Sequence, residues 1–206
     1  MVITSVQKNK TLKDTLDIYV DGMFSFSISE ADYVSLGLYE KRELTENQLN
    51  EIKTSVSMRQ AKSHAIRYVS SGVRSGKEVR KKLETFGFRR SIIDSVIIEL
   101  QAMGYINDRL YAEKYVFDRS KLNPKSKKLL AMELKSKGIS DEIITEVLDE
   151  WQADDGAVAL RLAKRKFGKY DITDAKIIKR IQSFLYHRGY DYEEIMNTIN
   201  RLKHDE

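Results

Sequence analysis

Three stretches of this chain, VRKKLETFGF (79–88), LAMELKSKGI (130–139) and IQSFLYHRGY (181–190), share one pattern, and their spacing decides the fold. In the first stretch two apolar residues four positions apart, Val79 and Leu83, precede Gly87. The equivalent residues recur at intervals of 51 positions, as Leu130, Leu134 and Gly138 and as Ile181, Leu185 and Gly189. Apolar residues at this spacing mark one face of a helix, and a glycine after it supplies the left-handed residue that ends a helix. The pattern predicts three repeats.

Each repeat is expected to contain three helices. After the glycine, apolar residues continue at helical spacing, as at Ile93, Val96 and Leu100 in the first copy. A further helical segment precedes each pattern, at residues 58–70, 108–120 and 154–167. The predicted fold is mainly α, with three-helix repeats at 58–105, 106–152 and 153–206 stacked into an elongated, curved array. Such arrays generally bind extended partners.

Residues 1–57 are predicted to form a small α+β module that contains a β-hairpin. Apolar residues alternate in LDIYV and FSFSI on either side of an Asp-Gly turn at 21–22. A three-residue loop at 20–22 pairs Ile18 with Phe24 and keeps one face apolar, so this register is predicted. Helices are expected after Ser29 and after Thr45, the second ending near residue 57.

Composition restricts the class of protein. The chain has 206 residues, 41% of them hydrophobic, which is enough for a core, and no cysteine. Disulfides and thiolate chemistry are therefore excluded, and a reducing cytoplasm fits. The start, MVITSVQKNK, does not resemble a signal peptide, and no run of about eighteen apolar residues occurs. We expect a cytoplasmic monomer without membrane contact.

A stretch resembling a phosphate-binding loop, SSGVRSGKEVRKKL (70–83), fails the requirements of that motif. Only three residues separate Gly72 from Gly76, and Glu78 stands where a magnesium-binding hydroxyl is needed. Ser75 and Glu78 instead have the spacing of a capping box at a helix start. The sequence therefore predicts no nucleotide cofactor here.

Other catalytic patterns are also absent. The histidines His64, His187 and His204 are far apart and have no second ligand at a metal-binding spacing, so surface or packing roles are expected. Paired acidic residues, as at 141–142, fall in predicted first helical turns, where they complement the helix dipole. We predict that the protein is not an enzyme and has no catalytic residues, metal or cofactor.

Charge is concentrated in the middle of the chain. Residues 1–57 have a net charge of −3, residues 58–137 of +11 and residues 138–206 of −3. Such an excess attracts phosphates or an acidic protein surface. The residues predicted to form a basic stripe are Arg74, Lys77, Arg80, Lys81, Lys82, Arg89, Arg90, Lys121, Lys125, Lys127, Lys128, Lys164, Arg165 and Lys166. In the alternative, part of this set only solubilises helices, with Glu78 pairing with Lys82.

Aromatic residues accompany these cations and have two interpretations. Base stacking is one function open to Tyr68, Tyr105, Tyr111, Tyr115 and Phe117. The helical spacing of Tyr111 and Tyr115 favours packing between the repeat units, which is the prediction adopted.

The segment GYINDRLYAEKYVFDR (104–119), with VRKKLETFGF before it and MELKSKGI after it, closely resembles the RecX family of bacterial recombination regulators. The resemblance covers residues 58–206 and implies three tandem three-helix repeats. The hairpin segment YVDGMFSFSIS looks like the N-terminal extension of some Gram-positive members. The third repeat keeps YHRGY, whereas the preceding FGKYDITDAK is less typical of the family.

The resemblance implies a specific function, which amino-acid composition alone does not predict. RecX proteins bind the filament of the recombinase RecA on single-stranded DNA, lie in its helical groove, and modulate strand exchange, ATP hydrolysis and repressor cleavage, mostly downward. The implied partners are the RecA filament and single-stranded DNA, contacted directly or within the filament. The alternative is a general DNA-binding protein that acts through phosphate contacts.

Overall fold

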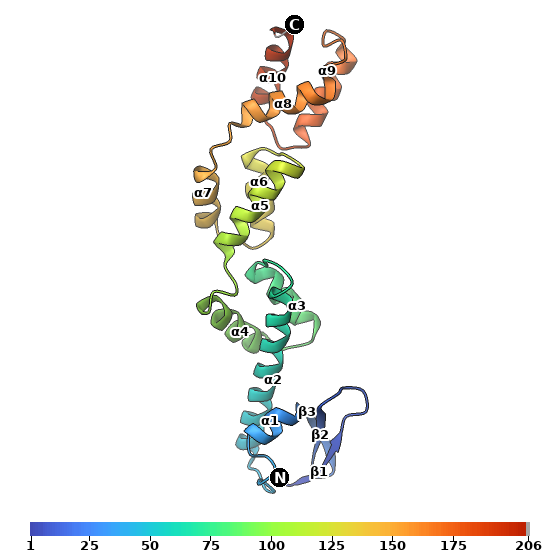
Figure 1. Ribbon diagram of the computed structural model, residues 1–206, viewed down its shortest axis with the longest axis vertical. Coiled ribbons are helices and arrows are strands. Elements are labelled where there is room, and N and C mark those ends of the chain that lie inside the picture. Colours follow the sequence, from blue (N-terminus) through green and yellow to red (C-terminus); the bar gives the residue numbers. More distant parts are fainter. Residues whose placement is uncertain (205–206) are drawn as a thin grey trace. The chain divides into compact units, whose positions relative to one another are not determined.

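The computed structural model describes residues 1–204, and its contacts divide the chain into two compact units. Unit 1 comprises residues 1–71 and 80–102, and unit 2 comprises residues 72–79 and 103–206. The described residues form β1 (Ile3–Lys8), β2 (Thr15–Val20), β3 (Met23–Ser29), α1 (Glu30–Ser35), α2 (Glu46–Val69), α3 (Gly76–Thr85), α4 (Arg90–Ala102), α5 (Asp108–Leu122), α6 (Lys127–Ser136), α7 (Asp141–Glu150), α8 (Asp155–Phe167), α9 (Ala175–Tyr186) and α10 (Tyr192–His204) (Figure 1). The predicted fold class, mainly helical with a small strand-containing N-terminal module, is confirmed.

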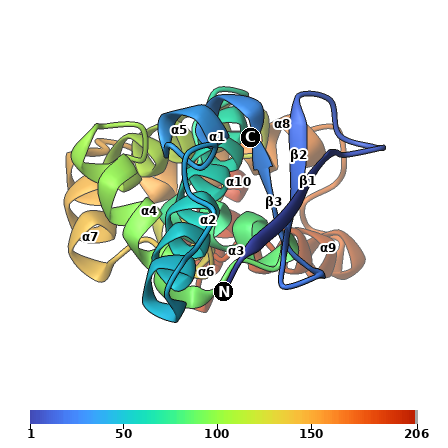
Figure 2. The same ribbon diagram turned by 90° about the horizontal axis from the view of Figure 1, so that it is seen from below.

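Unit 1 is built on a three-stranded antiparallel sheet in the order β1-β2-β3. Ile18 and Ile28, on β2 and β3, are fully buried and share a core with Leu49, Ile52 and Val56 of α2. Figure 2 shows the sheet with α1 and α2 along it. The second half of α2 packs against α4. One long helix thus connects the sheet to the first repeat.

The predicted hairpin register is wrong. The turn contains two residues, Asp21 and Gly22, both with positive φ (49° and 83°), which suits a two-residue hairpin turn. A bulge then shifts the pairing so that Ile18 lies opposite Phe26 instead of Phe24, which pairs with Tyr19. The extra residue in the bulge, Ser25, brings Phe26 opposite Ile18. The bulge therefore keeps one face of the hairpin apolar, as the predicted three-residue loop would have done.

The prediction of two helices between Thr45 and residue 70 is also wrong. Thr45 caps the helix as expected, with a capping box to Gln48, but α2 then continues without a break to Val69. No glycine or proline interrupts residues 46–69. Buried residues on both halves, such as Val56 and Ala65, stabilise one continuous helix through their packing.

The predicted helix ends of the repeats are confirmed. Gly87, Gly138 and Gly189 have φ values of 78°, 85° and 86°, the left-handed conformation expected after a helix. The Ser75 hydroxyl accepts from the Glu78 N–H (3.2 Å), and the Glu78 carboxylate accepts from the Ser75 N–H (3.4 Å). The stretch that resembled a phosphate loop is therefore a capped helix start.

Unit 2 contains two helical cores. Helix α7 packs on α5 and α6 around residues that include Val116, Leu134 and Val147. Helix α8 packs on α9 and α10 around residues that include Phe167 and Leu185 (Figure 1). Each core thus belongs to one set of three helices.

Candidate functional site

The basic residues predicted to bind a partner are spread over both units. Unit 1 carries Arg80, Lys81, Lys82, Arg89 and Arg90, whereas unit 2 carries Arg74, Lys77, Lys121, Lys125, Lys127, Lys128, Lys164, Arg165 and Lys166. Within the units they gather in three places: the second half of α3 with the start of α4, the start of α6, and the last turn of α8. The single stripe that would join these clusters stays a prediction.

In the first cluster, two lysines of α3 present their charge to solvent. Lys81 and Lys82 are both exposed. The Lys82 ammonium lies 5.1 Å from the centre of the Phe86 ring and 6.0 Å from that of Tyr68. A cation over an aromatic face keeps its charge available while its position is restricted. This pair is therefore suited to binding an anionic partner.

Arg80, in contrast, is engaged within the first repeat. Its guanidinium forms an ion pair with Asp94 (2.5 Å), and Arg90 approaches the same carboxylate at 4.0 Å. The predicted pairing of Glu78 with Lys82 is wrong, because the Glu78 carboxylate accepts from the Lys137 ammonium at 3.0 Å. Lys82 is thus not neutralised by Glu78.

The second cluster combines exposed and engaged lysines. Lys128 and Lys121 are exposed, and the Lys121 ammonium lies 3.9 Å from the centre of the Phe117 ring. Lys125, whose side chain is only 14% exposed, forms an ion pair with Glu133. Lys127 is half-buried. Lys125 is therefore better described as a structural residue than as a binding residue.

Glu133 connects Lys125 to α5 and makes repeat stability depend on pH. Its carboxylate also accepts from the Tyr115 hydroxyl (2.9 Å) and lies 3.6 Å from Arg119. Burial acts to raise the pKa of Glu133, but the hydrogen bonds from Lys125 and Tyr115 and the nearby positive charges outweigh burial and hold the pKa below its usual value.

We expect Glu133→Gln to lower the free energy of unfolding by about 2 kcal/mol at pH 7, because the half-buried Lys125 ammonium loses its anionic partner. A carboxylate with a depressed pKa stabilises the fold above its unfolded pKa, and this contribution is lost as pH falls through the folded pKa. The difference between wild type and variant should therefore vanish in acid. Urea titrations at several pH values measure it, with exposed Glu84→Gln as the control. A difference that stays unchanged through the whole acid range in which the protein remains folded would contradict this role.

The third cluster lies over a group of aromatic rings. Lys166, in the last turn of α8, places its ammonium 4.2 Å from the centre of the Phe184 ring. Sequence reasoning missed two arginines here: Arg180 lies 5.3 Å from the Tyr170 ring and Arg188 lies 3.9 Å from the Phe184 ring. Arg180 immediately precedes Ile181, the first apolar residue of the repeated pattern. Its position next to the apolar stripe of that helix could therefore have been predicted from the repeat.

Within unit 2 the repeats meet at two equivalent joints. The Ser75 hydroxyl donates to the Lys137 carbonyl at 2.8 Å, and the Gly76 N–H donates to the Asp108 carboxylate at 2.9 Å. These contacts join the start of α3 to the next repeat. Since Ser75 is fully buried, its bonds are shielded from water.

The same arrangement recurs 51 residues later. The Ser126 N–H donates to the Arg188 carbonyl at 2.9 Å, and the Lys127 N–H donates to the Asp155 carboxylate at 2.8 Å. In both joints a serine that caps one helix meets the glycine turn of the following repeat. The periodic sequence therefore encodes how neighbouring repeats are connected as well as each helix hairpin.

Two predicted binding residues belong to the first joint. The Lys77 side chain packs over Gly138, and its ammonium donates to the Ser136 carbonyl at 3.0 Å. Arg74 is half-buried and lies close enough to Tyr111 for its charge to act on that phenol. Lys77 therefore helps to hold the joint, and Arg74 lies beside it.

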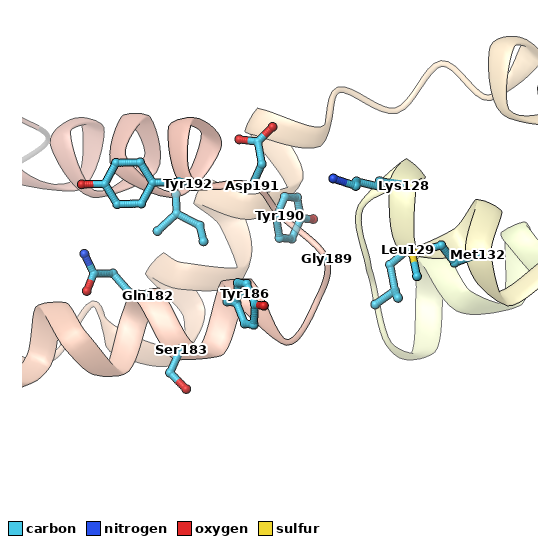
Figure 3. A pocket seen from close by; sticks show the side chains of 11 residues that line it. Lys128, Leu129, Met132, Gln182, Ser183, Tyr186, Gly189, Tyr190, Asp191 and Tyr192 are labelled. Carbon is cyan, nitrogen blue, oxygen red and sulfur yellow. The ribbon is translucent and has the colours of Figure 1, made fainter.

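The second joint borders a groove of about 840 Å³. Figure 3 shows Leu129 and Met132 of α6 on one side, with Gly189 and Tyr186 on the other. Nearby, burial raises the pKa of Asp155 despite its hydrogen bond from the Lys127 N–H and the Lys127 charge, which act to lower it. The positive charge of Lys127 therefore stabilises the Asp155 carboxylate at the second joint.

The aromatic residues divide between the two interpretations. Tyr111 is buried and its hydroxyl donates to the Glu78 carboxylate at the start of α3 (3.1 Å), so packing between repeats is confirmed for Tyr111. Tyr115 is half-buried, stacks on Tyr111 with centres 6.2 Å apart, and donates to Glu133 of its own repeat. Tyr105 and Phe117, in contrast, are 51% and 47% exposed, and the prediction of packing is wrong for them. Phe117 and Lys121 together present an aromatic face and a cation.

The titratable residues show no clustered metal ligands. In residues 1–204 no group of three histidine, cysteine, aspartate or glutamate side chains is arranged to hold a metal ion. His64 packs against the Phe86 ring at 4.2 Å between centres. Burial, followed by the positive charges of Arg67 and Lys82, lowers the pKa of His64. His64 thus has the packing role expected for it.

Comparison with known proteins identifies the repeats. Residues 107–148 match the family model of the second three-helix domain of RecX, and residues 153–199 match that of the third. The regulatory protein RecX of Clostridium acetobutylicum is 30% identical over 97% of this chain and 95% of its own. This chain belongs to the RecX family. The RecX of Bacillus cytotoxicus is 29% identical over 99% of this chain and 78% of its own.

Solved structures support the same fold. The crystal structure of a regulatory protein RecX matches 100% of this chain and 99% of its own with a TM-score of 0.68, at 22% identity. RecX from Lactobacillus salivarius matches 71% of this chain and 97% of its own, with a TM-score of 0.62 at 27% identity. Throughout residues 1–204, every helix is too short or too polar to span a membrane.

Proposed function

We propose that this RecX family member is a non-catalytic regulator that binds the RecA filament on single-stranded DNA in its helical groove. Membership of the family carries the proposal. The exposed cations at Lys81, Lys82, Lys121, Lys128 and Lys166 support it, because they suit phosphates or acidic protein surfaces. The partners proposed are RecA and single-stranded DNA, and the regulator acts in the cytoplasm as a monomer.

The proposed mechanism is steric and electrostatic. In it, the joint at Ser126 holds the second and third repeats, both within unit 2, in a fixed arrangement, so that their cations engage a periodic partner together. A chain bound along the groove occupies the space that an incoming duplex or repressor needs. It therefore lowers strand exchange, ATP hydrolysis and repressor cleavage, while the hydrolytic chemistry belongs entirely to the recombinase.

The test is the rate of ATP hydrolysis by the cognate RecA on single-stranded DNA as this protein is titrated in. Binding to the same DNA without RecA is measured at matching salt. We expect hydrolysis to fall at concentrations well below those that coat free DNA, because the filament offers both protein and phosphate contacts.

Two other outcomes separate the alternatives. Inhibition only at concentrations that saturate the DNA, with a steep loss of binding as salt rises, would favour a general DNA-binding protein. No effect on hydrolysis at any concentration would contradict regulation of this recombinase. The two measurements share one protein preparation, so inactive protein is detected by its failure in both.

A further inference from the structure

Unit 1 contains a polar pocket of about 780 Å³ between the N-terminal sheet and the first repeat. Its lining comes from β3, from one face of α2, and from the turn that leads into α4. The lining residues that the argument uses are Phe24, Asn50, Lys53, Ser57, Phe88 and Arg89. Its volume lies within the range of small-molecule sites, roughly 300–1,000 Å³.

The charge of this lining has one sign. Lys53 and Arg89 contribute cations, and none of the residues that line the described pocket is an aspartate or glutamate. The nearby carboxylate of Asp17 already accepts from the Ser27 hydroxyl (2.6 Å) and from the Asn9 amide (2.9 Å). Since residues 1–57 have a net charge of −3, a purely cationic lining runs against the local composition.

Lys53 has no carboxylate partner on its own helix face. The residues three and four positions away on α2 are Leu49, Asn50, Val56 and Ser57. Lys53 is half-buried, as is common for a lysine whose stem packs while its ammonium reaches water. Because no carboxylate on this helix face neutralises it, the ammonium is available to an anion supplied by a ligand.

Aromatic side chains, among them Phe24 and Phe88, line the same pocket as these cations. Phe24 is 58% exposed, and its ring contacts Tyr19 edge-on, with centres 5.9 Å apart. The bulge in β3 pairs Phe24 with Tyr19 and leaves Phe26 opposite the core residue Ile18. Bulges commonly redirect a side chain beside a functional site. An exposed ring next to cations and hydroxyls fits a nucleobase with its phosphate.

We propose that this pocket binds one nucleotide unit of single-stranded DNA, with Lys53 and Arg89 on phosphate and Phe24 or Phe88 stacked on the base. The inference deepens the proposed function by giving the N-terminal module a ligand, and it rests on that function for the identity of the strand. Hydroxyl and amide groups such as Ser57 and Asn50 supply uncharged hydrogen bonds to the same nucleotide.

The test uses the full chain without RecA. Affinity for a labelled oligothymidylate is measured by anisotropy over a salt series, for wild type, Lys53→Gln/Arg89→Gln and the control Lys10→Gln/Lys41→Gln. The control removes two exposed lysine charges of the N-terminal module outside the pocket. We expect the pocket variant to bind about tenfold more weakly, with the slope of log K against log salt smaller by about 1.4, since each lost phosphate contact removes about 0.7.

Base recognition is tested separately with Phe24→Ala and an abasic strand of the same length. Wild type should bind the thymidylate at least about fivefold more tightly than the abasic strand, and Phe24→Ala should lose most of this preference. An oligonucleotide carrying 5-iododeoxyuridine should crosslink to Phe24 or Phe88 on irradiation.

Crosslinks that map only outside the pocket, or equal affinities of the two double variants, would overturn the proposal. An unchanged preference for bases in Phe24→Ala, together with loss of binding in the Lys53 and Arg89 variant, would reject stacking by Phe24. Retained crosslinking to Phe88 would then identify the stacking ring, whereas no crosslink to either ring would overturn the base site. RecA is absent, so these results are independent of the ATP hydrolysis test.

Discussion

Gly189→Ala is expected to destabilise the protein by about 3 kcal/mol. Gly189 has a φ of 86°, and an added Cβ would lie 2.4 Å from the Leu129 Cβ and 2.6 Å from the Ser126 hydroxyl oxygen. A left-handed residue other than glycine costs about 1–2 kcal/mol, and overpacking adds about 1–3 kcal/mol. Because the Leu129 Cβ is fixed to the α6 backbone, relief requires the joint in Figure 3 to open.

Gly87→Ala is the matched control for this prediction. Gly87 occupies the equivalent position in the first repeat and has a φ of 78°, but nothing lies within 4 Å of the position that an alanine Cβ would take there. Only the conformational cost of about 1–2 kcal/mol is expected for this variant. Urea denaturation followed by circular dichroism measures both variants. Equal losses would mean that close contact at the joint makes no contribution to stability.

The sequence predicted the repeats well because their determinants are local. A helix stripe such as Val79 and Leu83, a cap such as Ser75 and a terminal glycine each act within a few residues of chain. The 51-residue period then extended one pattern to all three copies. The same local features located Lys81, Lys82 and Lys128, which the structure leaves exposed.

Features set by distant partners were not predictable in this way. Lys125 forms an ion pair with Glu133, and the Lys77 ammonium donates to the carbonyl of Ser136, which is 59 residues away in the chain. The hairpin bulge at Ser25 depends on which face of β3 meets α2. In each case tertiary contact decides between locally acceptable alternatives, which short-range patterns cannot distinguish.

The joints suggest why Lys127 should be left out of a charge-reversal test. Its charge acts on Asp155, and its N–H binds the same carboxylate, so a glutamate at position 127 would repel a group that holds two repeats together. Loss of binding in such a variant would then report loss of structure. Lys81 and Lys82 are exposed and lie away from both joints, and Lys128 is exposed at the edge of the groove beside the second joint without a hydrogen bond of its own N–H to Asp155.

The triple variant Lys81→Glu, Lys82→Glu and Lys128→Glu is therefore expected to weaken binding to the RecA filament by at least about 100-fold while the fold persists. All three side chains are exposed. If they face phosphates, the dependence of log K on log salt should also become shallower by about 2–3. Filament binding measured by anisotropy, with circular dichroism to verify folding, provides the comparison.

A control with the same change in net charge separates local contact from general repulsion. Lys10→Glu, Lys13→Glu and Lys41→Glu alter three exposed lysines of the N-terminal module by the same six charges. General repulsion that follows net charge would weaken both triple variants alike, because both change the net charge by the same amount. Screening in physiological salt limits the effect of each individual charge to about 8–10 Å, which favours an effect of direct contact. Direct contact weakens only the first variant. A folded Lys81, Lys82 and Lys128 variant that binds as tightly as the control would remove these lysines from the filament interface. The third cluster, around Lys166, would then be tested in the same assay.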